Sequence, residues 1–195
     1  QEFAPNGVAV TIGQTNGGRG WLGTVQVGCD VQVSPAIVIG AFADYDWSNI
    51  RGDMADGGIV ANEKLSSSWA AGGRIGWGVV PQLLAYVSAG YSAARYDQLV
   101  FLNLVGGAVN GQTIAAHTYD GWFIGSGYEY AIGFLPGLFW KTEYRFMDYG
   151  TDRLAFLNAN GGPNGFTLDS HKYVQTVKSE LVWRFNWAGP VVAKY

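Results

Sequence analysis

The stretch from Tyr173 to Trp187 reads Y-V-Q-T-V-K-S-E-L-V-W-R-F-N-W, and its polarity alternates from one residue to the next. Successive side chains of an extended strand point to opposite faces, so Val177 and Leu181 share one face. Lys178 and Glu180 share the other. The stretch therefore predicts a strand with one apolar and one ionic face, and the rest of the chain must decide which face meets the solvent.

Composition favours a single all-β domain over residues 1–195. Charged residues make up only 14% of the chain, aromatic residues reach 15%, and there are 29 glycines. We find no apolar run of the 18 or more residues that a membrane helix needs. A transmembrane β-barrel remains allowed, because its strands alternate in polarity and dilute any window average.

Charge and cysteine content exclude several classes of function. The net charge of -3 offers no basic surface for nucleic acid. The lone Cys29 can form neither an internal disulfide nor a thiol metal cluster, and we interpret it as a small apolar strand residue. We therefore expect no cofactor, no metal and no nucleic-acid partner.

Six further segments show the same alternation as the closing stretch: 19–33, 37–47, 69–79, 83–96, 122–132 and 140–146. In the segment 83–96 the facing stays open, because Tyr86 and Val87 both suit a lipid-facing position. Together the segments predict an antiparallel up-and-down sheet.

The connections between these segments alternate in length. Short turns contain Pro35, Pro81 and Pro136, and three long polar segments, 48–68, 97–118 and 150–169, read as loops. Alternate connections of an up-and-down sheet lie at the same end. The asymmetry is typical of outer-membrane barrels, in which short turns are periplasmic and long loops extracellular.

Aromatic residues gather at both ends of the apolar faces and predict two girdles at the membrane interfaces. The loop-end group is Trp21, Tyr45, Trp47, Trp69, Trp122 and Tyr173; the turn-end group is Trp77, Tyr130, Trp140, Trp183 and Trp187. Their segregation to strand ends favours girdles over an ordinary sheet core. The apolar face then points to lipid and the ionic face points inward.

With that facing, the interior receives a charge network of nearly balanced sign: Asp30, Asp44, Asp46, Arg74, Glu129, Lys141, Glu143, Arg145, Lys178, Glu180 and Arg184. A barrel of about eight strands is just wide enough to be filled by side chains. Charges confined there must pair, because unpaired burial costs several kcal/mol per ion. We expect a salt-bridged plug, with a path for an ion or small solute as the alternative.

Three stretches carry a family resemblance: G-W-F-I-G-S-G-Y-E-Y-A from Gly121, K-T-E-Y-R-F from Lys141, and V-Q-T-V-K-S-E-L-V-W-R-F from Val174. They resemble the small outer-membrane β-barrel family of α-proteobacteria, related to opacity-type surface proteins and the OmpA-type membrane barrel. The resemblance implies eight strands, an outer-membrane location and a structural, porin-like or surface-interaction role. It also implies that Phe185 or Trp187 serves as the signal read by the barrel-assembly machinery.

The two ends of the chain depart from that family pattern. Residues 188–195 continue past the last strand, and we expect them to form a periplasmic tail. About seven strands are visible, where closure of this class calls for an even number. Either a first strand lies upstream of Gln1, or residues 8–14 within the loop-like segment 1–18 supply a short one.

An enzymatic role finds little support in the sequence. His117 and His171 lie near the loop ends of strands, with Ser126, Ser170 and Asp169 as candidate neighbours. There is no nucleophile elbow and no H-E-x-x-H motif. We therefore predict that the protein is not an enzyme.

Two features near the loop end suggest partners. Five basic residues could pair with phosphates of lipopolysaccharide or could be solvated loop charges: Arg51, Lys64, Arg95, Arg153 and Lys172. The run L-V-F-L-N-L-V from Leu99 to Val105 predicts either a site of self-association or extracellular contact, or a strand extension.

The sequence thus predicts an integral outer-membrane β-barrel of about eight strands with a structural or surface-interaction role. A narrow porin for small solutes is one alternative. A soluble ligand-binding β-barrel, with its apolar face turned inward around a ligand, is the other.

Overall fold

The computed structural model describes residues 1–56, 59–103 and 106–185. Its strands are β1 (Glu2–Phe3), β2 (Gly18–Arg19), β3 (Leu22–Gln32), β4 (Ile37–Asp56), β5 (Ile59–Val80), β6 (Leu83–Tyr96), β7 (Leu99–Asn103), β8 (Val109–Ile114), β9 (His117–Ala131), β10 (Leu138–Leu157) and β11 (Pro163–Trp183). No helix long and apolar enough to cross a membrane occurs in this part of the chain. The predicted all-β class is confirmed.

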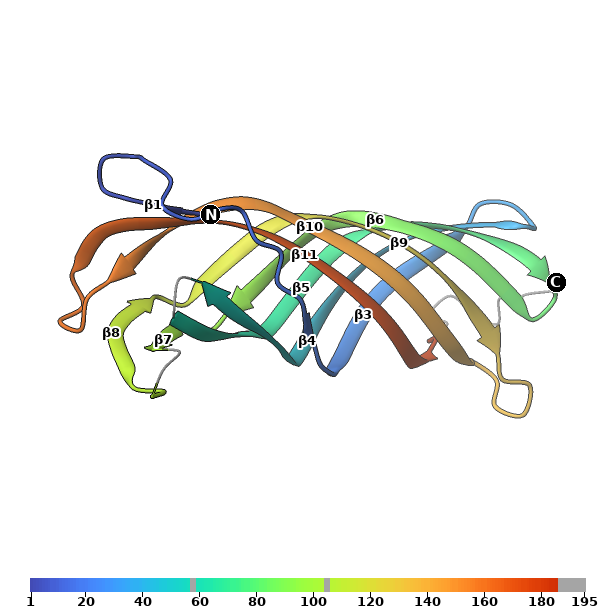
Figure 1. Cartoon of the computed structure of the whole chain (residues 1–195). Coiled ribbons are helices and arrows are strands. Elements are labelled where there is room, and N and C mark those ends of the chain that lie inside the picture. Colours follow the sequence, from blue (N-terminus) through green and yellow to red (C-terminus); the bar gives the residue numbers. More distant parts are fainter. Residues whose placement is uncertain (57–58, 104–105, 186–195) are drawn as a thin grey trace.

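Seven long strands make up the body of the fold. Each pairs antiparallel with the next, in the order β3, β4, β5, β6, β9, β10 and β11. Figure 1 shows the resulting sheet curled around a central axis. This is the predicted up-and-down, barrel-like arrangement, and we call the space it encloses the lumen.

Opposite charges help to set the register of the closing pair of strands. Lys141 on β10 lies opposite Glu180 on β11, and Glu143 lies opposite Lys178. Directly opposed side chains of an antiparallel pair share one face, where opposite charges stabilise and like charges destabilise. A slip by one residue would break both charge pairs, placing Ser179 and either Val177 or Leu181 opposite Lys141 and Glu143, and would move the side chains of one strand to the other face.

The three segments predicted as long loops are mostly strand, which corrects the sequence-based expectation. β4 continues to Asp56 and β5 starts at Ile59, while β10 and β11 pair as far as Leu157 and Pro163. Backbone hydrogen bonds do not depend on alternating side chains, so polar, glycine-rich sequence can still form a sheet. Hydrogen bonds such as that from Asn62 to Asp53, at 2.8 Å, add support.

The apolar run that begins at Leu99 falls on a hairpin, β7 and β8, which sits between β5 and β10. Leu99 and Phe101 are buried, whereas Val100 is exposed. The described part of this run is therefore a strand extension with one buried face. Leu104 and Val105 lie outside the described residues.

The two end strands of the series, β3 and β11, do not pair with each other in the described chain. β1 pairs with β11 near Leu168, and β2 pairs with β4 near Arg51. Residues 8–14 form no strand and make only an isolated bridge at Ala9, so they do not supply the short first strand considered above. We refer to the gap between β3 and β11 as the seam.

Candidate functional site

The inward-facing side chains divide the lumen into an ionic zone toward the short turns and an apolar zone toward the long hairpins. All eleven charges predicted for the lumen lie in the ionic zone. Seven of them are buried, and Asp30, Arg74, Glu180 and Arg184 keep partial exposure. The zone is therefore built from residues of β3, β4, β5, β9, β10 and β11, with Arg184 just past the end of β11.

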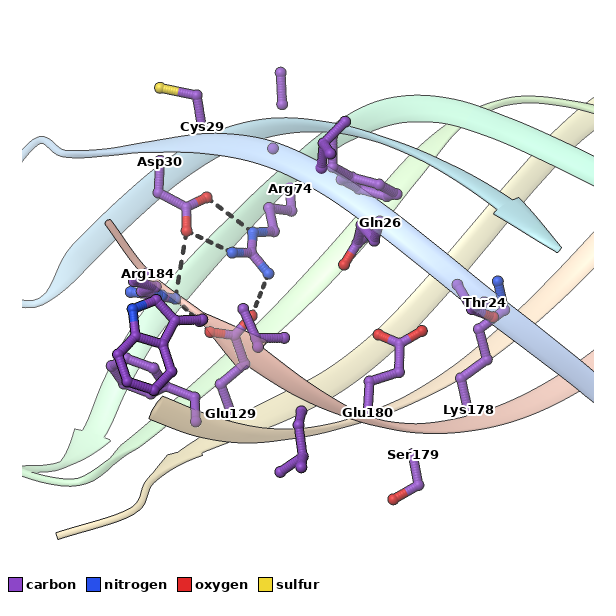
Figure 2. Close-up of a pocket in the computed structure, with 18 of the residues that line it drawn as sticks. Thr24, Gln26, Cys29, Asp30, Arg74, Glu129, Lys178, Ser179, Glu180 and Arg184 are labelled. Atoms are coloured by element: carbon purple, nitrogen blue, oxygen red, sulfur yellow. Dashed lines mark hydrogen bonds and ion pairs between the residues drawn. The ribbon is translucent and has the colours of Figure 1, made fainter. Parts of the chain in front are cut away.

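The first ionic cluster lies at the turn end (Figure 2). Arg74 Nε donates to Asp30 Oδ1 at 2.9 Å, and the same guanidinium also binds Glu129. Arg184 reaches Glu129 and lies 3.3 Å from Asp30. Two guanidinium groups and two carboxylates thus pair with one another, an arrangement in which the planar donors of arginine fit carboxylates well.

The second cluster surrounds Lys141. Its Nζ donates to Gln26 Oε1 at 2.7 Å and to Glu180 Oε2 at 2.9 Å, and it lies 3.0 Å from Glu143 Oε2. Tyr86 Oη donates to the same Glu143 oxygen at 2.9 Å. A buried ammonium with three oxygen partners is well compensated for its lost hydration.

The third cluster links Arg145 and Lys178 to two aspartates. Arg145 Nη2 lies 2.9 Å from Asp44 Oδ2 and 2.8 Å from Glu143 Oε1. Lys178 Nζ donates to Asp46 at 2.7 Å and to Asp44 at 3.3 Å. These four groups connect strands on opposite sides of the lumen, so the network ties the wall together across its interior.

Arg145 also marks the boundary with the apolar zone. Its guanidinium lies over the rings of Phe123, at 4.5 Å, and Phe42, at 5.4 Å. Beyond it, toward the hairpins, packs a continuous core that includes Leu65, Tyr96, Leu99, Phe101, Ile114, Tyr119, Met147, Tyr149, Leu154 and Phe156. Above the ionic zone, buried apolar side chains thus pack against one another inside the lumen.

The charge balance explains how so many ions can be buried. Six carboxylates face five cations, a net charge of -1, and each of the eleven takes part in at least one ion pair. Among the described residues no group of three or more histidine, cysteine or acidic side chains is arranged to hold a metal ion. The arrangement links strands on opposite sides of the lumen through ion pairs and so can brace the wall.

Sequence reasoning missed several lumen residues. Tyr86 faces inward and Val87 outward, which resolves the open facing of β6. Gln26 binds Lys141, and Phe42 and Phe123 pack against Arg145. Only their odd or even position on a strand whose facing was already assigned could have shown that these three side chains point inward. Neutral and aromatic side chains in a lumen carry no charge signal, which explains the omission.

The outward face carries the predicted aromatic residues. Ten of the eleven are exposed: Trp21, Tyr45, Trp47, Trp69, Trp77, Trp122, Tyr130, Trp140, Tyr173 and Trp183. Trp187 lies outside the described residues, as does the segment 188–195, while Phe185 is exposed. Trp140 Nε1 donates to Ser179 at 2.9 Å, so one ring at the turn end has its polar atom satisfied on the surface.

The two histidines find partners other than those expected. His117 Nε2 lies 2.7 Å from Asp152, and His171 lies 2.9 Å from Asp148 and 2.8 Å from Thr151 Oγ1. Ser126 lies instead on the outward face of β9. His171, Asp148 and Thr151 bring an imidazole, a carboxylate and a hydroxyl together. The nearby Gly150 amide donates to Asp148, so this amide is not free to stabilise an oxyanion.

The basic residues near the hairpin end are largely engaged within the protein. Lys64 pairs with Asp97 at 3.3 Å, Lys172 with Glu63 at 2.7 Å, and Arg153 with Asp169 at 2.6 Å. Arg51 bonds Asn49, and Arg95 is exposed. A lipid phosphate would have to compete with these carboxylates.

The Arg153 pair yields a pH prediction. The hydrogen bond from Arg153 holds the pKa of Asp169 below its usual range. A lowered folded-state pKa means that the pair stabilises the fold above the usual aspartate pKa, and that this stabilisation is lost as pH falls through the lowered value. We expect Arg153→Gln to raise the pKa of Asp169, measured by carboxyl ¹³C chemical shifts. Arg51→Gln is the control and should leave that titration unchanged; equal pKa values in the wild type and Arg153→Gln would contradict the prediction.

The sequence of this chain is similar to those of two outer-membrane proteins. The chain is 28% identical over 170 residues to the 31 kDa outer-membrane immunogenic protein of Brucella melitensis biotype 1 and to the protein of the same name from Brucella suis biovar 1. The match covers 85% of this chain and 67% of each relative. No family model matches the chain, and no solved structure matches it. The relatives support the outer-membrane part of the resemblance expected from the sequence.

Proposed function

We propose that the protein is an integral outer-membrane β-barrel of the opacity or OmpA type that acts at the cell surface without catalysis. The observation that carries this proposal is the inversion of the fold: the outward face is apolar and the interior is ionic. A soluble ligand-binding barrel would need the reverse. The name of the Brucella relatives, which describes outer-membrane immunogenic proteins, supports the same reading.

The asymmetry of the two ends supports the proposed orientation. The hairpins β4–β5, β7–β8 and β10–β11 lie at one end and the short turns at the other. Outer-membrane barrels keep short turns in the periplasm and longer segments outside. The hairpin end, with β7 and β8, is then the surface offered to an extracellular or self-association partner and to lipopolysaccharide. Phe185 is the described candidate for the signal to the barrel-assembly machinery.

The lumen carries a structural role in this proposal. The three ionic clusters occupy the turn-end half of the lumen, and Phe42, Arg145 and Phe123 form the layer above them. The apolar zone then closes the hairpin end. A narrow porin would need a continuous polar path through that zone. We therefore propose a plugged barrel, and a plugged barrel should show no steady conductance.

A reconstitution experiment tests the proposal. Protein folded in detergent should migrate differently on gels before and after boiling, and in planar bilayers it should give no long-lived openings. Recovery of folded protein from the aqueous phase without detergent would refute membrane integration. Large, steady openings would instead support the porin alternative.

Surface exposure can be tested in intact cells. A single cysteine replacing Val109 on β8, in a Cys29→Ser background, should react with a membrane-impermeant maleimide. A cysteine replacing Gln82, in the short turn between β5 and β6, is the matched control and should react only after the outer membrane is opened. The reverse pattern would overturn the orientation while leaving membrane integration intact.

A further inference from the structure

A cavity of about 1790 Å³ opens at the seam between β3 and β11. Inward-facing residues such as Asp30 and Glu180 line it, and so do outward-facing residues of both strands, among them Val27, Val177 and Leu181. In Figure 2, Asp30 and Glu180 point into this space from the two strands. The cavity therefore passes through the wall of the sheet, between two strands that lack a shared neighbour.

The backbone edges along the seam have no strand partner in the described chain. The Asp169 amide donates toward β1, whereas the Arg184 amide donates to Gly137 on the β10 side. Because alternate residues of a strand point their backbone groups to opposite sides, the odd-numbered residues of β11 from His171 to Trp183 face the seam. In a hydrocarbon environment such groups must be hydrogen-bonded.

Exposure along the seam supports a missing neighbour. Val27, Val177 and Leu181 are 70%, 72% and 70% exposed, whereas Ile75 and Ile124, on strands with neighbours on both sides, are 52% and 54% exposed. All five side chains point outward. The difference is what the removal of one adjacent strand would produce.

Polar atoms on the inner side of β11 also indicate a missing neighbour. Thr176 Oγ1, Glu180 Oε1 and Arg184 Nε are buried and have no hydrogen-bond partner among the described residues. Buried polar groups in native proteins are almost always hydrogen-bonded. All three atoms belong to β11 or to the residue directly after it, beside the open edge.

β1 gives the direction and register of the missing element. Glu2 lies opposite Leu168 and Phe3 opposite Thr167, antiparallel to β11. Gln1 and Asp169 exchange both backbone hydrogen bonds, each at 2.9 Å. Each step upstream of Gln1 therefore corresponds to one step along β11 toward Trp183, which leads directly into the seam.

We propose that the residues directly preceding Gln1 in the complete polypeptide fill the seam as a strand between β11 and β3. The pairing of Gln1 with Asp169 places the fourteenth residue before Gln1 opposite Trp183. Residues at even steps face outward and should be apolar. Residues at odd steps face the lumen, where the seventh and eleventh meet Thr176 and Glu180 and should be small or polar.

Other occupants fit the seam less well. The inner wall is ionic, so a lipid acyl chain would leave its charges and its backbone groups unsatisfied. A strand from a second copy would have to enter beside β1, which already pairs with β11 and is directed along the same edge. Direct pairing of β3 with β11 would have to collapse the cavity.

Disulfide mapping of the complete polypeptide tests the register. In a Cys29→Ser background, Leu181→Cys is combined with a cysteine at the tenth, twelfth or fourteenth residue before Gln1. Opposed residues of a hydrogen-bonded antiparallel pair have Cα atoms about 5.5 Å apart, within reach of a disulfide. We expect an intramolecular disulfide at the twelfth position and none at the other two.

Several results would overturn the proposal. They are a bridge at a different register, the absence of any bridge in folded protein, a bridge between two molecules, or, when Leu181→Cys is made with Cys29 retained, a bridge from native Cys29 to the new cysteine. The last two would indicate a second copy and a direct β3–β11 contact, respectively. None of them would affect the proposed membrane location.

Hydrogen exchange tests the same inference without substitutions. The amides of Val177 and Ser179 on β11, and of Gln26 and Gly28 on β3, face the seam. We expect them to exchange at least about tenfold more slowly in the complete polypeptide than in the chain that starts at Gln1. Equal exchange rates in the two proteins would refute the proposed strand, whether lipid occupies the seam or β3 and β11 close it directly.

Discussion

Replacing Arg145 with leucine is expected to lower the free energy of unfolding by about 3–5 kcal/mol. The guanidinium is buried, pairs with Asp44 and Glu143, and lies over two aromatic rings. Leucine can pack against the rings, but it deprives both buried carboxylates of one cationic partner. Urea unfolding of protein folded into lipid vesicles measures the loss.

Two matched variants separate charge pairing from packing at this site. Arg153→Leu also breaks an arginine–carboxylate pair, but an exposed one, and should lower the unfolding midpoint far less than Arg145→Leu does. Adding Asp44→Asn to Arg145→Leu should recover part of the loss, because it removes one of the orphaned charges. If Arg145→Leu alone is as stable as the wild type, the ionic clusters do not brace the wall.

Replacing Ile124 with arginine is expected to cost about 2–4 kcal/mol of folding free energy in a bilayer. Ile124 lies on the outward face of β9, between the exposed rings of Trp122 and Tyr130. If that face meets lipid, the charge must enter hydrocarbon or distort the bilayer around it. Folding equilibria in vesicles, compared with the wild type, report the cost.

The same substitution outside the aromatic band provides the control. Val109 is 61% exposed on β8, within the hairpin that extends beyond the band. Val109→Arg should leave the folding equilibrium unchanged. A neutral result at both positions would mean that the outward face meets water, which would contradict membrane integration.

Much of the fold could be predicted from the sequence because strand facing is encoded locally. The alternation around Lys178 and Glu180 fixes which side chains share a face. The proline-containing turns indicate which strand ends lie at the same end of the sheet. Local alternation placed the eleven charged residues of the ionic zone inward, but it did not identify the inward-facing Lys172–Glu63 pair nearer the hairpins. It could not say which ions pair, because Arg145 and Asp44 are 101 residues apart and meet only across the curled sheet.

The sequence-based prediction was wrong where strands extend beyond their amphipathic segments. Segments such as 48–68 lose their alternation because both faces can be polar there, yet backbone pairing continues to Asp56. The inward Tyr86 was equally hard to assign, because a tyrosine suits a lipid interface and a lumen carboxylate alike. Its partner, Glu143, lies on a strand that it meets only through the folded interior.

The length of β5 determines how far the molecule reaches beyond the lipid. Its 22 residues, at about 3.3 Å each, span roughly 70 Å along the strand. A strand tilted by about 35–45° then rises roughly 50 Å, against a hydrocarbon layer of about 30 Å. In the proposed orientation the hairpins would stand roughly 20 Å clear of the hydrocarbon as a rigid sheet. An antibody raised against the folded protein would meet a fixed backbone surface there, so its epitope would depend on conformation, and peptides cut from these hairpins would be poor substitutes for the folded protein.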